Sequence, residues 1–565
     1  MEHLQRQNKI KKLLCALLIL GSVLAALKLI FVGFCQDEEY QIVMAYRRVM
    51  GDRMFADMWE PHQMSSFLNA AFIRIFLLFT GSATGIVVYL RVMGTLLQLL
   101  ITLLFYFTLK KTTEKETAFL HSLFWFNCSM GLFVSAEYSS MMLWFSTLSI
   151  LFLQNARLAD PRGRSHVLFF LLSDIALCLC VLSYPVMAVF ALLLWIFTAL
   201  DTPPALRKKT MLLLILPCVI IGAAYVLFHA AAVSFPVFFE TLPRIFLQDP
   251  THQVSENSFW SEKLLHAARD LAVDGALALG ALGVSALLLR KKTMAEKLAF
   301  ASLLSLLMVC GQWLLFHKGY ENGHIHTLVS AAGFFLLCRV HRGKDRSLCR
   351  LFFSGGAVMV LGGWALSNMS FDDKLSFGPL IHIAFLLLLC PALVKEDRKR
   401  LFTVTAVIWI FFLIFAKGFL LRSGREVNNI TALENICRTG PAKGILTDYM
   451  NAYIMDADYE DWGRFVREGD RVLIVSENLH SNIYISYLFE DVTISDCAVN
   501  NPHDYGRRLL EYWERYPERA PSVIVTDCWY GQELISPDEW IMDYIKKDFG
   551  YTEVQDGRYL RFYRK

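Results

Sequence analysis

Long, uninterrupted apolar segments are the feature that most restricts what this chain can fold into. A helix needs about 20 apolar residues to cross the hydrocarbon core of a bilayer, and several segments of this sequence reach that length. The chain is 55% hydrophobic and only 19% charged. We therefore predict a polytopic α-helical membrane protein with about thirteen transmembrane helices. These lie near residues 12–34, 84–109, 117–136, 138–156, 166–183, 185–200, 210–233, 270–290, 298–316, 325–340, 350–367, 378–394 and 401–420.

The basic residues predict how these helices are oriented. Lys and Arg cluster in the N-terminal segment and in every second loop, whereas the alternate loops hold few of them. Because basic loops stay on the cytoplasmic side of a membrane, we expect a cytoplasmic N-terminus. An odd number of spans then places everything after residue 420 outside the cytoplasm. The short loops favour a bacterial cell membrane.

Other bulk properties argue against several functional classes. The net charge of +4 is too small to indicate nucleic acid binding. The 13 cysteines are scattered and predict neither a disulfide framework nor a CxxC metal site. No GxGxxG or Walker motif follows a predicted strand. We therefore expect neither a nucleotide cofactor nor a nucleic acid partner.

The composition changes after residue 420, where short runs rich in Val and Ile alternate with amphipathic segments. Strands are predicted at 471–475, 492–494 and 522–526, helices at 480–489, 504–516 and 537–549, and a closing strand or hairpin at 551–563. This alternation predicts a small parallel-type sheet with helices on its faces. We therefore divide the chain into a membrane module, residues 1–420, and a soluble extracytoplasmic α/β domain, residues 421–565.

The first long outside loop, residues 35–83, carries acidic residues directly after the first span. It begins Gln36-Asp37-Glu38-Glu39-Tyr40 and later reads Trp59-Glu60-Pro61-His62-Gln63. A carboxylate held at the end of a membrane helix in a partly dry place would have a raised pKa and could act as a base. The plainer interpretation is a solvated helix end, because charged residues are mostly exposed.

The order of these features resembles the GT-C superfamily of membrane glycosyltransferases. The sequence is most similar to the protein O-mannosyltransferases and the bacterial aminoarabinose transferases, and the similarity is strongest over residues 12–110. The resemblance implies that Asp37 is the general base and that Glu38 is its acidic neighbour. It also implies that Arg91, early in the second span, and Glu137, after the third, bind the donor phosphate or the acceptor.

The Glu60-Pro61 pair resembles an acidic-x-Pro element of the same superfamily. The resemblance implies that Glu60 positions the donor or helps to hold a divalent metal cation. Relatives often carry Lys after this Glu, whereas Pro61 and His62 follow here. Phosphate binding at His62 is therefore an open expectation.

A second polar group lies between two later spans, in His317-Lys318-Gly319-Tyr320 and His324-Ile325-His326. Lys318 and Tyr320 are candidates for contact with the donor phosphate or the acceptor. Alternate residues of an extended segment share a face, so His324 and His326 could bind a divalent metal together with Glu60. The alternative is that the histidines cap helix ends or contact lipid headgroups.

Together, the resemblance implies an inverting hexosyl- or pentosyltransferase. The donor would be a sugar on a polyprenyl phosphate in the membrane lipid, and the acceptor an extracytoplasmic glycan, lipid or protein. Two alternatives stay open. One is a transporter or flippase of a lipid-linked or cell-envelope precursor, although carriers favour internal repeats and polar residues at the membrane midplane. The other is a non-catalytic envelope assembly protein.

Overall fold

A computed structural model of the chain describes residues 2–34, 36–128, 134–247, 259–316, 324–340, 346–367, 370–395, 397–420, 433–475, 492–497, 506–537 and 539–565. The helix expected at 480–489 lies outside these residues. Lys318 and Tyr320 lie outside them as well.

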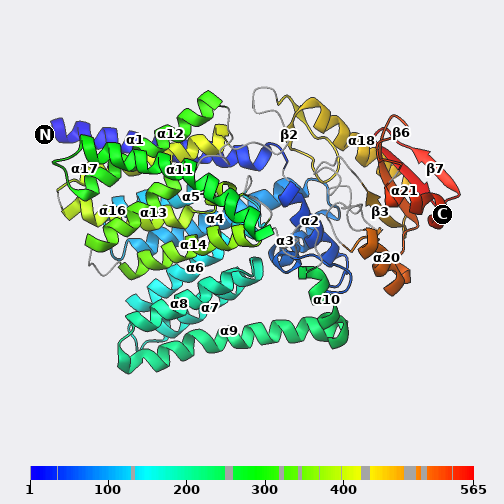
Figure 1. The fold of residues 1–565 in the computed structure, drawn as a ribbon, viewed down its shortest axis with the longest axis horizontal. Helices are drawn as coiled ribbons and strands as arrows, with labels where there is room; N and C mark the ends of the chain where they lie inside the picture. The colour runs from blue at the N-terminus through cyan, green and yellow to red at the C-terminus, as the bar shows by residue number, and fades with distance from the viewer. Residues whose placement is uncertain are drawn as a thin grey trace.

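Helices dominate the chain up to residue 420, and each apolar segment expected to span the membrane overlaps one of them (Figure 1). The helices Lys115–Asn127 and Tyr138–Leu158 are not among those long and apolar enough to cross a membrane, so within the described residues the expected thirteen spans are too many. The helices of this part are α1 (Glu2–Phe31), α2 (Gln36–Val49), η1 (Gln63–Ser66), α3 (Phe67–Thr80), α4 (Ile86–Leu109), α5 (Lys115–Asn127), α6 (Tyr138–Leu158), α7 (Arg164–Ser183), α8 (Met187–Asp201), α9 (Pro204–Val233), α10 (Phe235–Leu247), α11 (Phe259–Leu288), α12 (Met294–Phe316), α13 (Ile325–Val340), α14 (Arg346–Ala365), α15 (Phe371–Leu375), α16 (Pro379–Lys395), α17 (Lys399–Phe415) and η3 (Ala416–Leu420).

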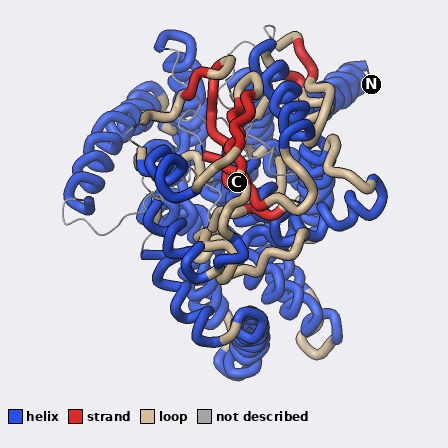
Figure 2. The backbone as a smooth tube through the Cα atoms, turned by 90° about the vertical axis from the view of Figure 1, so that its right-hand side faces the viewer, coloured by secondary structure: helices blue, strands red, loops and turns tan. Residues whose placement is uncertain are grey.

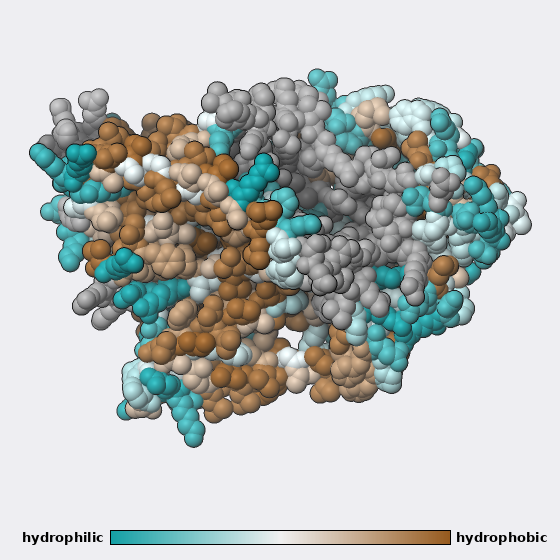
Figure 3. All heavy atoms as spheres, in the orientation of Figure 1, coloured by the Kyte–Doolittle hydropathy of each residue, from teal (hydrophilic) through white to brown (hydrophobic). Residues whose placement is uncertain are grey.

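The outer faces of these helices are apolar, as a lipid environment requires. Within the described part of the chain, nine helices are long and apolar enough to cross a membrane, and α8, α13 and α16 are shorter apolar helices. Leu24 on α1, Phe228 on α9 and Leu279 on α11 are 58%, 66% and 70% exposed. Figure 3 shows the helical part covered by hydrophobic residues and the opposite end by hydrophilic ones. The protein is therefore a multi-pass membrane protein.

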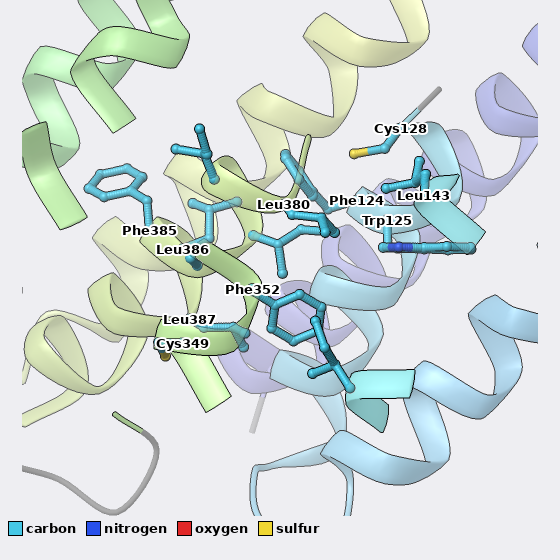
Figure 4. Close-up of a cluster of buried hydrophobic side chains, with 14 of the residues drawn as sticks. Phe124, Trp125, Cys128, Leu143, Cys349, Phe352, Leu380, Phe385, Leu386 and Leu387 are labelled. Carbon is cyan, nitrogen blue, oxygen red and sulfur yellow. The ribbon is translucent and has the colours of Figure 1, made fainter. Parts of the chain in front are cut away.

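Inside the bundle, large side chains pack against small ones. Phe124 and Trp125 on α5, Phe352 on α14 and Phe385 on α16 belong to one buried hydrophobic cluster (Figure 4). A Cβ on Gly356 would lie only 2.8 Å from the backbone nitrogen of Ile381. Membrane helices approach closely where small residues stand at their interface, and this contact holds α14 against α16.

The first long loop folds into short helices between the bundle and the C-terminal strands (Figure 1). The helix α3 carries an outward apolar stripe, and Ile75 and Leu78 are 46% and 81% exposed. Together with η1, it is also long and apolar enough to cross a membrane.

The C-terminal region is a mixed α/β structure (Figure 2). Its elements are β1 (Asn435–Ile436), β2 (Leu446–Thr447), α18 (Tyr449–Phe465), β3 (Arg471–Val475), β4 (Thr493–Ile494), α20 (Gly506–Arg515), η6 (Pro517–Arg519), β5 (Val523–Trp529), β6 (Gln532–Glu533), α21 (Trp540–Tyr544), η7 (Ile545–Phe549), β7 (Glu553–Asp556) and β8 (Leu560–Arg564).

The main sheet has the strand order β4-β3-β5-β8-β7, and β6 pairs with β5. The parallel arrangement expected from the sequence is found for β4, β3 and β5. By contrast, β8 pairs antiparallel with both β5 and β7, which makes the sheet mixed. For β7 and β8 the reason is local, because they form a hairpin and a short connection between neighbouring strands allows only the antiparallel arrangement, whereas β5 and β8 are distant in sequence.

The C-terminal region is fastened to the first loop by backbone contacts and buried charges. The Trp59 amide donates to the carbonyl of Cys497 at 2.6 Å, and Arg508 donates to the carbonyl of Trp59 at 2.8 Å. Arg519 pairs with Asp52 at 2.7 Å and with Asp57 at 3.3 Å. These contacts join two parts of the chain that are far apart in sequence.

Candidate active site

Asp37 stands at the start of α2, immediately after the first membrane helix. The first turn of a helix favours acidic side chains because its free N–H groups carry partial positive charge. The Asp37 side chain is exposed to solvent, and the Tyr138 hydroxyl donates to its Oδ2 at 3.3 Å. The carboxylate is thus accessible while a side chain from α6 holds it in place.

Protein atoms surround Asp37 closely even though solvent reaches it. Desolvation by these atoms raises the pKa of Asp37, and the positive charge of Lys374 and the hydrogen bond from Tyr138 offset part of that rise. An aspartate with a raised pKa is a stronger base than an ordinary aspartate.

Glu137 is the N-cap residue of α6 and lies next to this aspartate. It is buried and accepts hydrogen bonds at Oε1 from the Ser139 hydroxyl, the Ser140 hydroxyl and the Ser140 amide. Burial raises the pKa of Glu137 to about 7, and the negative charge of Asp37 adds to the rise. Both carboxyl groups therefore have raised pKa values, and perturbed pKa values are common in acid–base sites.

Lys374 supplies the positive charge beside the two acids. It lies on the short helix α15, its side chain is buried, and its ammonium group stands 4.4 Å from the Phe377 ring centroid. Burial lowers the pKa of Lys374, whereas Asp37, Asp373 and Glu137 raise it in part. A buried ammonium group must be compensated by neighbouring charge, and these acids provide it.

Aromatic rings connect Asp37 to the Glu60-Pro61-His62 element. The His62 ring stacks on Tyr138 with 4.3 Å between centroids, and on Tyr184 with 5.9 Å. The Tyr40 hydroxyl donates to Glu60 Oε2 at 2.6 Å. The structure therefore brings Asp37, Glu60, His62 and Glu137 into one connected group of side chains.

Glu38 and Arg91 are placed differently from the residues around Asp37. Arg91 Nη2 pairs with Glu38 Oε2 at 2.6 Å, and Arg91 also donates to the carbonyls of Gly33 and Ile30. Both side chains are buried. Glu38 forms an ion pair with Arg91 that fastens α2 and the end of α1 to α4, and its expected catalytic role beside Asp37 stays a prediction. Successive helix residues point about 100° apart, so neighbours in sequence face different surroundings here.

The histidines expected to hold a metal lie in a different setting. His324 and His326 are buried, and the His326 ring stacks on His382 with 5.0 Å between centroids and lies 5.6 Å from Trp409. Among the residues that the structure describes, no group of three or more His, Cys, Asp or Glu side chains could hold a metal ion. The donor set of Glu60, His324 and His326 therefore does not fit a metal centre, and we derive no chemical step through one.

Comparisons with known proteins give a distant likeness over nearly the whole chain. No family model and no curated protein matches it. The chain is similar to ArnT from Cupriavidus metallidurans in the apo state, at 12% identity and a TM-score of 0.44, covering 99% of this chain and 98% of that one. It is similar to ArnT from Cupriavidus metallidurans bound to undecaprenyl phosphate at 9% identity and a TM-score of 0.49, covering 98% of each chain.

The chain is also similar to the archaeal oligosaccharyltransferase AglB from Archaeoglobus fulgidus in complex with an inhibitory peptide and a dolichol-phosphate. The identity is 12% and the TM-score 0.41, covering 92% of this chain and 69% of that one. The function of this chain is argued from its own side chains.

Three tyrosines and a lysine of this site were not predicted from the sequence. Tyr40 and Tyr138 stand directly beside the acidic run and Glu137, and this proximity in sequence is the signal that could have indicated them, whereas Tyr184 has no such neighbour. Lys374 is the single basic residue in an otherwise acidic and apolar segment, Phe371-Asp372-Asp373-Lys374-Leu375. Such a lone charge between two membrane helices is expensive unless it is paired, and that was the available signal.

Proposed function

We propose that the chain is an integral membrane glycosyltransferase that moves a sugar from a polyprenyl-phosphate donor to an acceptor outside the cytoplasm. The observation that carries the proposal is an accessible carboxylate, Asp37, that accepts a hydrogen bond from Tyr138 and feels the positive charge of the buried Lys374, at the end of the helix bundle that meets the C-terminal region. A lipid-linked donor reaches such a position from the bilayer, and no nucleotide is required there.

In the proposed reaction Asp37 is the general base. The acceptor hydroxyl attacks the anomeric carbon from the side opposite the phosphate, and Asp37 takes its proton as the new carbon–oxygen bond forms. The bond between the anomeric carbon and the phosphate oxygen breaks, so the configuration inverts and polyprenyl phosphate leaves. The positive charge of Lys374 acts on Asp37, and positive charge stabilises the leaving phosphate.

The other members of the group position the base. The Tyr138 hydroxyl orients Asp37, and His62 stacks on the ring that carries this hydroxyl. Glu137 holds a proton near neutral pH, which limits the negative charge beside Asp37 when the donor phosphate arrives. Tyr40 fixes Glu60 in the same way that Tyr138 fixes Asp37.

The test replaces Asp37 and measures the envelope. Cells that lack the protein are complemented with the wild type, with Asp37→Asn or with Asp160→Asn, and their glycans and polyprenyl lipids are compared by mass spectrometry. Loss of the base is expected to slow product formation by about 100-fold or more, and the sugar-loaded polyprenyl phosphate should accumulate. Asp160, exposed beyond the far end of α6, is the matched control and should behave as wild type.

The same experiment separates the alternatives. A normal amount of product with Asp37→Asn contradicts the assignment of the base. If cells with Asp37→Asn still carry the precursor across the membrane and have the same envelope composition as cells with the wild type, a transporter explains the protein better. A defect that wild type and Asp37→Asn restore equally would favour a non-catalytic assembly role.

A further inference from the structure

The turn between β5 and β6 holds a tyrosine where the backbone favours other residues. Trp529 pairs with Gln532, so Tyr530 and Gly531 form a two-residue hairpin turn. Their φ angles are +48° and +83°. A turn with two positive φ values is usually built from Asn-Gly or Asp-Gly, because a bulky side chain at positive φ is strained.

Contacts on both sides keep this turn in its strained form. The Tyr530 amide donates to the carbonyl of Arg558 at 2.9 Å, and Arg561 donates to the carbonyl of Gly531. The Cys528 amide donates to the carbonyl of Tyr559 at 2.8 Å. Backbone strain that the surroundings hold in place is a feature of ligand-binding positions.

The strained turn presents large aromatic rings to solvent. Tyr530 is 64% exposed and Trp529 is 46% exposed, so both leave apolar ring surface in contact with solvent. The Tyr559 ring stands 5.2 Å from Trp529 and 5.9 Å from Tyr530. Tyr453, on α18, lies 6.0 Å from Tyr559 and continues the row. We name Trp529, Tyr530, Tyr559 and Tyr453 the aromatic patch.

Charged groups of both signs surround the aromatic patch. The Arg558 guanidinium stands 6.0 Å from the Tyr453 ring centroid and pairs with Glu460. Asp458 is only 5% exposed, and its Oδ1 has no hydrogen-bond partner within the described residues. Burial and the contact with Tyr530 raise the pKa of Tyr559 most, and the negative charge of Asp458 adds to the rise, which places that carboxyl close to the patch. A buried carboxyl oxygen without a partner is a group that a ligand hydroxyl could satisfy.

The position and chemistry of the patch favour one class of ligand. Figure 1 shows β6 at the end of the molecule opposite the N-terminus of α1 and far from the helix bundle, where no bilayer would reach. Sugars have apolar C–H faces that stack on aromatic rings and hydroxyl edges that hydrogen-bond to carboxyl and guanidinium groups. Exposed aromatic patches rimmed by polar groups commonly mark binding sites.

We propose that the aromatic patch is a carbohydrate-binding site that holds a glycan chain of the cell envelope on the C-terminal region. Trp529 and Tyr530 stack on sugar rings, and Asp458 and Arg558 bind hydroxyl groups. This site is separate from Asp37, and its binding does not depend on the transfer chemistry proposed above.

The test measures glycan binding to the full-length chain in lipid nanodiscs. The probes are cellohexaose, mannohexaose, chitohexaose and the polysaccharide fraction extracted from the envelope of the source cells. Wild type should retain at least one of them, and Trp529→Ala should weaken retention about tenfold, as expected for the loss of one stacked ring. Tyr551→Ala is the matched control, because Tyr551 is 39% exposed in the same region but lies outside the patch.

A second variant distinguishes binding from packing. Tyr530→Asn should weaken retention while raising the Tm, because Asn tolerates the positive φ that strains Tyr. A residue with only a structural role would lower the Tm. Asp37→Asn should bind glycan as wild type does, which separates this proposal from the proposed enzyme.

Three results would overturn the proposal. One is a wild type that retains none of the four probes. Another is retention by Trp529→Ala and Tyr530→Asn equal to that of wild type. Capture of an envelope protein through the patch, with no glycan retained, would also overturn it and identify a protein site instead.

Discussion

At the scale of single residues, Glu137 makes the folded protein sensitive to pH. Burial raises its pKa from an ordinary 4.5 to about 7. A carboxyl group whose pKa is raised by folding contributes stability that is fully present below pH 4.5 and is lost as the pH rises through about 7. Between these two pH values the free energy of unfolding of the wild type should therefore fall by at most about 3 kcal/mol. Glu137→Gln should remove this fall. Thermal unfolding in detergent at pH 5 and pH 8 measures it, and an unchanged pH dependence in the variant would contradict the assignment.

The candidate site could be predicted residue by residue only where a local pattern existed. Asp37, Glu60, His62 and Glu137 follow membrane spans or stand in short polar runs, and the structure joins them. Tyr138 and Lys374 reach Asp37 from distant segments, and no spacing in the sequence reports that contact. Asp37 and Glu38 are adjacent in sequence, but a helix turns neighbouring side chains to different faces, and the contact of Glu38 with Arg91 could not be read from the sequence.

At the scale of elements, apolar length was a sufficient signal for the membrane helices and for the central strands. A run such as Arg471–Val475 coincides with β3 because it is apolar, branched and bounded by turn residues. The helix α18 was not predicted, since its face is mixed and its start depends on Asp448, whose carboxyl group caps the amide of Asn451. The antiparallel place of β8 depends on contacts distant in sequence, which local patterns do not contain.

The buried pair of Glu38 and Arg91 allows a prediction at the same scale, because it joins α2 to α4. Arg91→Met leaves a buried carboxylate without its partner and should destabilise the protein by about 3–5 kcal/mol. The double variant with Glu38→Gln should recover part of this loss, because the unpaired charge is gone. A double-mutant cycle of Tm values measures the coupling. If the Tm of the double variant falls by the sum of the decreases in the two single variants, the two residues do not act as a unit.

At the scale of the whole molecule, the C-terminal region meets the loop that carries the candidate base. Arg47, on α2, donates to the carbonyl of Asp496 at 2.6 Å, and its Nε pairs with Asp52 at 2.8 Å. The same Asp52 pairs with Arg519. A chain of buried contacts therefore runs from the C-terminal region to the helix that begins with Asp37. We infer that this region holds α2 in place, in addition to any role in binding the acceptor.

Two neighbouring arginines test this inference, because each joins the C-terminal region to the membrane part in a different environment. Arg519 pairs with the buried carboxylates of Asp52 and Asp57, whereas Arg515 pairs with Glu240, which is 57% exposed. Arg519→Met should cost about 1–3 kcal/mol, because it removes charge-assisted hydrogen bonds from buried acids. Arg515→Met should cost less than about 1 kcal/mol, as exposed ion pairs do. If α2 depends on the docked region, Arg519→Met should also lower product formation while Arg515→Met leaves it unchanged. Equal losses of stability and activity in the two variants would show that the buried contacts do not position the candidate base.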